Sequence, residues 1–196
     1  MDPLATGLAR RPGGPPDIAG AMVDTGAVHV LLAAPCPDPP APWQDRGDRW
    51  TLPAGAQLPP AEPQAARAAL PVLAAVGSQA GIHLLLNLER LGVLAIHGDP
   101  DRARGLLRYL AAEVACQTWS DPAEIVVTGF HPRESELLTT LSPRLRPVAS
   151  VAGAVDLMRR WAAIRSDPAP TAAQPAVPGA TDRPRLLFAA APTPAD

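Results

Sequence analysis

The sequence predicts an α/β fold in which a mainly parallel sheet is flanked by helices and preceded by a small β-hairpin region. Strand-like and helix-like segments alternate between residues 82 and 191, which is typical of a parallel sheet with right-handed crossovers. Two strand-like runs, residues 27–34 and 49–52, lie upstream on either side of a proline-rich loop and could pair. Hydrophobic residues make up 47% of the chain and charged residues 18%, so a sizeable core can be buried.

The later strands are predicted by different patterns. Residues 70–76 and 82–88 flank Gly77-Ser-Gln-Ala-Gly81, a segment bracketed by glycines that predicts a β-hairpin. Residues 92–97 form a near-continuous apolar run, as expected of a strand covered on both faces. Further strands are expected at residues 124–128, 145–149 and 185–191.

A long helix is expected to begin just after Gly98. Asp99 is a natural N-cap, and Pro100 suits the first helical position. The apolar residues then recur with the spacing of one buried helix face: Ala103, Leu106, Leu107, Leu110, Ala111 and Val114. Shorter helices are expected at residues 134–141 and after Ser150, with brief helical segments at residues 4–9 and 64–69.

The 26 prolines gather in a few stretches, which divide the chain into blocks. We expect an N-terminal β segment with Pro-rich loops at residues 1–63 and an α/β core at residues 64–165. A Pro/Ala linker or loop at residues 166–183 leads to a final core strand and tail at residues 184–196. The polar end directly after that strand suggests a truncated chain, with a complete gene product as the alternative.

Charge and composition exclude several classes of function. The net charge of −2 gives no long-range attraction for nucleic acid, so no direct nucleic-acid contact is expected. All 17 basic residues are arginines, which excludes a Schiff-base lysine and a phosphate-binding lysine. Cys36 and Cys116 have neither metal-ligand spacing nor a CxxC motif, so a reduced compartment and no metal are expected.

The sequence shows no membrane-spanning or signal-peptide pattern, which bears on where the chain is located. No apolar run approaches the roughly 18–20 residues of a membrane span, and the first residues lack the apolar core of a signal peptide. A cytoplasmic chain without membrane insertion is therefore expected. A membrane tether through a region outside this chain stays open.

Chemistry in an open α/β sheet is expected where a strand leads into a helix, here at residues 97–105. The candidate ligand-binding residues are Gly98, Asp99, Arg102 and Arg104. A working phosphate loop needs converging glycines, a lysine and a Ser or Thr hydroxyl, and this loop has one glycine at its start and Gly105-Leu106 at the hydroxyl position. Asp99 and Asp101 place carboxylates where a phosphate would sit, so the loop is predicted to be unfit for ATP.

The stretch from residue 70 to residue 130 resembles the middle region of large actinobacterial proteins that join a membrane-anchored LysM region to a bacterial transcriptional activator domain. It is more distantly similar to the P-loop ATPase domains of FtsK-like translocases and type VII secretion motors. In that resemblance Leu86-Asn87-Leu88 stands at an apolar strand that precedes the P-loop strand.

The same resemblance implies that the nucleotide site has degenerated. Gly98 matches the first glycine of the Walker A loop, Ala103 replaces the second glycine, and Arg104 replaces the lysine. Gly105-Leu106 replaces the Ser/Thr pair. Residues 185–191 would be the Walker B strand, with residues 189–191 all alanine where the two carboxylates should be. The resemblance thus implies a nucleotide-binding fold without hydrolysis and without a cofactor.

Three functions remain to be weighed. The favoured one is a non-catalytic regulatory or protein-interaction domain of a bacterial transcription regulator or membrane-tethered signalling protein, whose partner is another protein or a neighbouring domain. The alternative is a nucleotide-binding sensor without hydrolysis that uses Arg104 in place of lysine. A DNA-binding role is disfavoured because the chain has neither a basic surface nor a helix-turn-helix signal.

Other polar residues have structural explanations that we prefer. His97 is expected to be a hydrogen-bonded histidine at a strand end, and His29 and His83 are expected on solvent faces. Arg102, Arg104 and Arg108 form a basic stripe that is expected to be a solvated helix face. His131 and Ser135 have no acid at a recognisable spacing and no GxSxG elbow, so a hydrolase is not expected. Trp119 is expected to plug the turn between a helix and the next strand.

Overall fold

The computed structural model describes residues 8, 15–58, 70–117, 123–165 and 184–190, which form a mixed α/β protein. The chain divides into two compact units, which we describe separately. Unit 1 comprises residues 1–97 and 117–121, and unit 2 comprises residues 98–116 and 122–196. Four of the predictions fall outside the described residues: the boundary at residues 63 and 64, the helical segment at 64–69, the place of Trp119 and the linker at 166–183. So does all of the expected segment 4–9 except Leu8.

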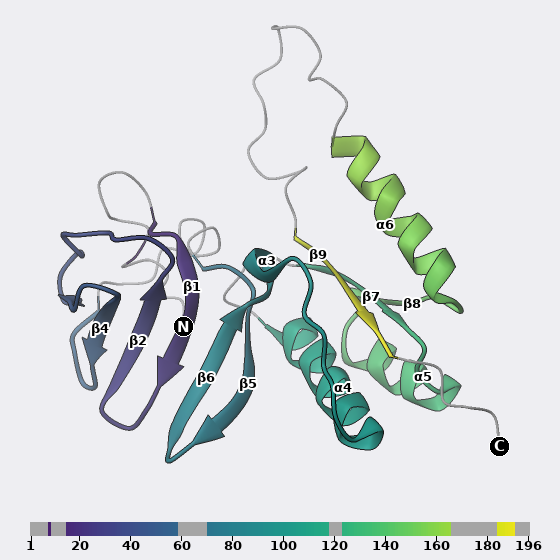
Figure 1. The fold of residues 1–196 in the computed structure, drawn as a ribbon, viewed down its shortest axis with the longest axis horizontal. Coiled ribbons are helices and arrows are strands. Elements are labelled where there is room, and N and C mark those ends of the chain that lie inside the picture. Colours follow the sequence, from purple (N-terminus) through teal and green to yellow (C-terminus); the bar gives the residue numbers. More distant parts are fainter. Residues whose placement is uncertain (1–7, 9–14, 59–69, 118–122, 166–183, 191–196) are drawn as a thin grey trace, which may run out of the picture. The chain divides into compact units, whose positions relative to one another are not determined.

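Unit 1 is built on a six-stranded antiparallel sheet with the order β3-β4-β2-β1-β6-β5 (Figure 1). Its strands are β1 (Ile18–Val23), β2 (Ala27–Leu32), β3 (Gln44–Asp45), β4 (Arg49–Pro53), β5 (Leu73–Gln79) and β6 (Ile82–Asn87). The predicted pairing of β4 with β2 and the predicted hairpin are both confirmed. The short helix α3 (Leu88–Leu91) follows β6 and is capped by Asn87.

The hairpin turn is tighter than the two glycines of the sequence suggest. Gly77 lies within β5, and the turn itself is formed by Ala80 and Gly81, which both have positive φ (50° and 80°). Two successive residues with positive φ match the right-handed twist of the flanking strands, as in a type I′ turn. The turn thus fixes the register that pairs Gln79 with Ile82.

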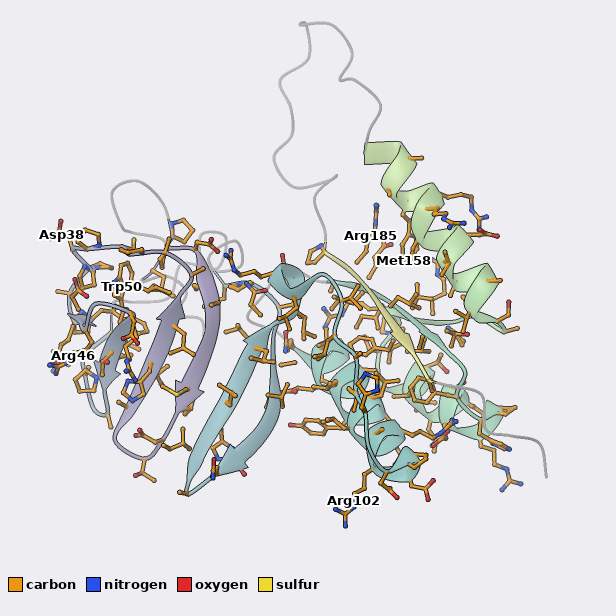
Figure 2. All side chains as sticks on the ribbon, viewed as in Figure 1. Asp38, Arg46, Trp50, Arg102, Met158 and Arg185 are labelled. Carbon is orange, nitrogen blue, oxygen red and sulfur yellow. The ribbon has the colours of Figure 1, made fainter. Side chains whose placement is uncertain are left out.

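Trp50, labelled in Figure 2, belongs to the hydrophobic core of unit 1. Its side chain is fully buried, and its indole N–H donates to the carbonyl oxygen of Cys36 at 2.8 Å. The other buried members of this core are Leu8, Ile18, Ala21, Val30, Trp43, Leu52, Leu70 and Leu73. Residues from β1, β2, β4 and β5 and from the adjoining loops therefore share one hydrophobic core.

Unit 2 is built on a three-stranded parallel sheet with the order β8-β7-β9. Its elements are α4 (Pro100–Cys116), β7 (Glu124–Thr128), α5 (Pro132–Leu141), β8 (Leu145–Pro147), α6 (Val151–Arg165) and β9 (Arg185–Ala189). Helices α4 and α5 lie on one side of this sheet and α6 lies on the other (Figure 1). The predicted alternation of strands and helices is confirmed from residue 100 onwards.

The structure differs from the prediction of a mainly parallel sheet, because the larger sheet is antiparallel. One reason is that β1 was not predicted, and this strand joins the N-terminal strands to the β5–β6 hairpin. Gly20 at its bulge lowers strand propensity, yet the structure needs it, because an added Cβ would lie 2.5 Å from the carbonyl oxygen of Leu85. The hairpin consequently pairs with β1 and not with the parallel sheet.

The prediction of a buried strand at residues 92–97 is wrong. This segment has no strand pairing among the described residues, and Val93 is 88% exposed. An apolar run shows that a segment could be buried, but a strand also needs a neighbour whose backbone accepts and donates its hydrogen bonds. The described strands offer the segment no such neighbour.

Candidate functional site

The segment at residues 97–105, where an open α/β sheet would bind a ligand but whose charges are predicted to be unfit for ATP, runs directly into α4. Asp99 caps this helix, since its carboxylate accepts a hydrogen bond from the backbone N–H of Arg102 at 2.9 Å. Gly98 has a φ of 127°, a conformation that favours glycine. Gly98, Asp99 and Arg102 are all exposed (Figure 2 labels Arg102). The helix N-terminus, where an anion would bind, is therefore already occupied by the carboxylate of its own capping residue.

Arg104 does not join the other three candidate residues. Its side chain is 22% exposed and donates to the carbonyl oxygen of Gly129 at 3.0 Å. It also lies 3.8 Å from a carboxylate oxygen of Glu134 on α5. The guanidinium that would replace the phosphate-binding lysine is thus turned toward the β7–α5 connection and has an internal counter-ion.

Glu134 is the centre of this polar cluster, and the sequence did not single it out. One carboxylate oxygen accepts from Arg108 at 2.6 Å, and the other accepts from the backbone N–H of His131 at 3.0 Å. The His131 side chain in turn accepts from the backbone N–H of Arg133, which completes a capping box at the start of α5. The predicted solvated stripe on α4 is therefore partly paired, because Arg104 and Arg108 both face Glu134.

The carboxyl ends of β7 and β9 are joined closely beside this cluster. The backbone N–H of Ala190 donates to the carbonyl oxygen of Thr128 at 2.9 Å. Gly129 follows with a φ of 77°, and an added Cβ there would lie 2.0 Å from the carbonyl oxygen of Ala190. The backbones that follow β7 and β9 therefore lie in close contact at this edge of the sheet.

The histidines differ in their surroundings. His83 is exposed, as predicted, and His131 caps α5. His97 is also exposed and follows no strand among the described residues, so the prediction of a hydrogen-bonded histidine at a strand end is wrong. His29 is less exposed than expected of a solvent-facing residue, and its two ring nitrogens lie 3.3 Å from Asp24 and 3.0 Å from Thr51. This row of hydrogen bonds connects the β1–β2 turn, β2 and β4. No group of three or more potential metal ligands occurs among the described residues.

Two arginines that the sequence did not single out contact the Trp161 ring. Arg146 of β8 lies 5.7 Å from the ring centroid and Arg185 of β9 lies 5.2 Å from it. The spacing of 15 and 24 residues along the chain gives no local signal for this cluster. Only the parallel pairing of β8 and β9 with β7 brings the two arginines to the same helix.

Comparisons of this chain with family models, curated proteins and solved structures find no match. In the described parts of the chain, every helix is too short or too polar to cross a membrane.

Proposed function

We propose that this chain is a non-catalytic regulatory or protein-interaction domain with a degenerate P-loop-like nucleotide-binding fold. It would act in the cytoplasm within a bacterial transcription regulator or membrane-tethered signalling protein, where it would bind another protein or a neighbouring domain. The observation that carries the proposal is the pairing of Arg104 with Glu134 and with the Gly129 carbonyl. A triphosphate would have to displace both partners to reach this guanidinium.

Two further features support a loop that does not bind nucleotide. Asp99 occupies the N-terminus of α4, and Asp101 adds a second carboxylate in the first turn. Coulomb repulsion between each carboxylate and a nearby phosphate is on the order of 1–4 kcal/mol in wet surroundings. Catalysis of phosphoryl transfer depends on positive groups that neutralise the transferred phosphate. Asp99 and Asp101 instead place negative charge at the N-terminus of α4.

The test is to measure nucleotide binding and hydrolysis with the full chain. We expect no heat on calorimetric titration with millimolar ATP or GTP in the presence of Mg²⁺, and no phosphate release above the buffer rate. Phosphate release would overturn the proposal. Heat without phosphate release would favour the alternative of a nucleotide sensor.

The Glu134→Gln variant serves as a matched control in the same titration. This substitution removes the counter-ion of Arg104 while it keeps an oxygen that can accept from the His131 N–H. We expect the variant also to fail to bind ATP, because Asp99 still occupies the helix N-terminus. Binding that appears only in Glu134→Gln would identify a masked nucleotide site and contradict the proposal.

A further inference from the structure

The cluster of Arg146, Trp161 and Arg185 lies between α6 and the outer strands of the parallel sheet. Trp161 is half-buried, and both guanidinium groups lie within the distance at which a cation is attracted to a ring. Arg185 and Met158 of α6 are labelled in Figure 2, in the region between β9 and α6. Arg146 comes from one edge strand of the sheet and Arg185 from the other, so the Trp161 ring contacts side chains from both edges.

The two arginines differ in their hydrogen-bond and ion-pair partners. Arg185 donates to the carbonyl oxygen of Trp161 at 2.7 Å and lies 3.9 Å from a carboxylate oxygen of Glu124, so it has a structural role. Arg146 is exposed, and no carboxylate of the described residues lies within ion-pair distance of it. A stacked guanidinium keeps its N–H donors free at its edge, where a carboxylate can accept two of them.

The charge around this cluster is positive on balance. Among the described side chains of β8, α6 and β9, the basic residues are Arg146, Arg159, Arg160 and Arg185. Two carboxylates offset part of this charge: Asp156 of α6 pairs with Arg159 at 3.5 Å, and Glu124 of the neighbouring strand β7 lies 3.9 Å from Arg185. The whole chain nevertheless has a net charge of −2, so this excess of positive charge is local. A local basic patch attracts a short acidic ligand more than a long polyanion, which the rest of the chain repels.

We propose that Arg146, held against Trp161, is the docking point for an acidic segment of a protein partner. The inference rests on the proposed function and specifies its binding surface. A Glu or Asp of the partner accepts two hydrogen bonds from the Arg146 guanidinium, and Arg185, which Glu124 partly neutralises, adds a weaker positive potential at the same ring. Because the ring already restricts the Arg146 side chain, less conformational entropy is lost on binding than for a free arginine.

The test uses the full chain and a fluorescein-labelled dodecapeptide rich in Glu and Asp, followed by fluorescence anisotropy at low salt. The comparison peptide carries Gln and Asn at the same positions. We expect the acidic peptide to bind and the amide peptide to fail. Arg146→Gln should weaken binding about tenfold, as expected for loss of a charge-assisted pair of hydrogen bonds. In ¹⁵N spectra, the Trp161 indole signal should shift on titration.

Arg102→Gln is the matched control, since Arg102 is also exposed and lies on α4, on the other side of the parallel sheet. An equal loss of affinity in both variants would mean that only net charge matters, and it would overturn the inference. Tighter binding of a DNA duplex than of the acidic peptide, with the same dependence on Arg146, would also overturn it.

The two proposals can fail separately. Phosphate release from ATP would remove the proposed function whatever the peptide does. Failure of the acidic peptide to bind, with no ATP turnover, would remove only this docking point and leave the interaction domain with another surface.

Discussion

At the scale of single residues, Gly129 joins β7 to the turn before α5 in a conformation that favours glycine. Its φ is 77°, and an added Cβ would overlap the carbonyl oxygen of Ala190. We predict that Gly129→Ala lowers the free energy of unfolding by about 2–4 kcal/mol, from backbone strain and from displacement of β9. Urea denaturation followed by circular dichroism measures the change.

Gly105→Ala provides the control for that substitution. Gly105 lies within α4, and an added Cβ there meets no atom within 4 Å. Alanine should therefore stabilise the helix by about 0.5–1 kcal/mol. If both variants were equally destabilised, the close approach of Gly129 to Ala190 would not be the cause.

Asp24 gives a residue-scale prediction about acid stability. Hydrogen bonds from the backbone N–H of Gly26, then of Ala27, and then from His29 hold the pKa of Asp24 below its ordinary value. A carboxyl whose pKa is lower in the folded than in the unfolded state stabilises the fold above the unfolded pKa, near pH 4. This stabilisation is lost as the pH falls through the folded pKa.

Asp24→Asn should therefore be less stable than the parent chain at pH 6, and the difference should shrink below pH 4. The effect should be modest and salt-dependent, because the site is exposed to solvent. Urea denaturation at pH 6, 4 and 3 measures it. A difference that stays constant over this range would show that the ionised carboxylate contributes nothing beyond its shape.

At the scale of secondary-structure elements, Glu134 connects α5 to α4 and also caps α5. Glu134→Gln removes the ion pairs with Arg104 and Arg108 but can keep the hydrogen bond from the His131 N–H. We predict a loss of about 0.5–1 kcal/mol for this partly exposed pairing. Glu134→Ala also removes the capping hydrogen bond and should lose about 1 kcal/mol more.

Thermal unfolding of the two Glu134 variants, with Glu136→Ala as an exposed neighbour on the same helix, measures these differences. Equal losses in Glu134→Gln and Glu134→Ala would assign the whole effect to the ion pairs. A loss as large in Glu136→Ala would show that general helix propensity, and not the capping box, controls α5.

Also at the scale of elements, local signals predicted the helices better than the sheets. Asp99 and Pro100 marked the start of α4, and Ser150 marked the start of α6, because capping depends on residues within one helical turn. Pairing of β1 with β6 depends on residues 60 to 66 positions apart, and no local pattern contains it. The exposed segment at 92–97 has the composition of a buried strand, so composition alone gave the wrong prediction.

The candidate site was predicted only in part for the same reason. The sequence located the loop before α4 and its unsuitable charges, since these are contiguous residues. It did not reveal Glu134, which lies 30 residues beyond Arg104 and reaches it only because α4 packs against α5. The contacts of Arg146 and Arg185 with Trp161 likewise follow from strand order, which the sequence does not state.

At the scale of the whole molecule, two compact units imply two regions that can open separately. Trp50→Phe shrinks a fully buried side chain and removes the donor to the Cys36 carbonyl. We predict that amide hydrogen exchange becomes faster in β2 and β4 of unit 1, while β7 in unit 2 keeps its protection. Mass spectrometry of peptic fragments measures both regions in one experiment. Equal acceleration in β7 would show that the chain unfolds as a single cooperative body.

Gln117 directly follows the last residue of α4 but belongs to unit 1, where its side-chain amide donates to the carbonyl oxygen of Leu73. A gene cut after His97 would therefore leave β5 without a donor that the intact chain supplies from beyond α4. No single cleavage of the polypeptide can separate the two units cleanly. Dissection of this protein calls instead for a circular permutation, or for a linker that replaces the 17 residues of α4, spans their length of about 25 Å and retains Gln117.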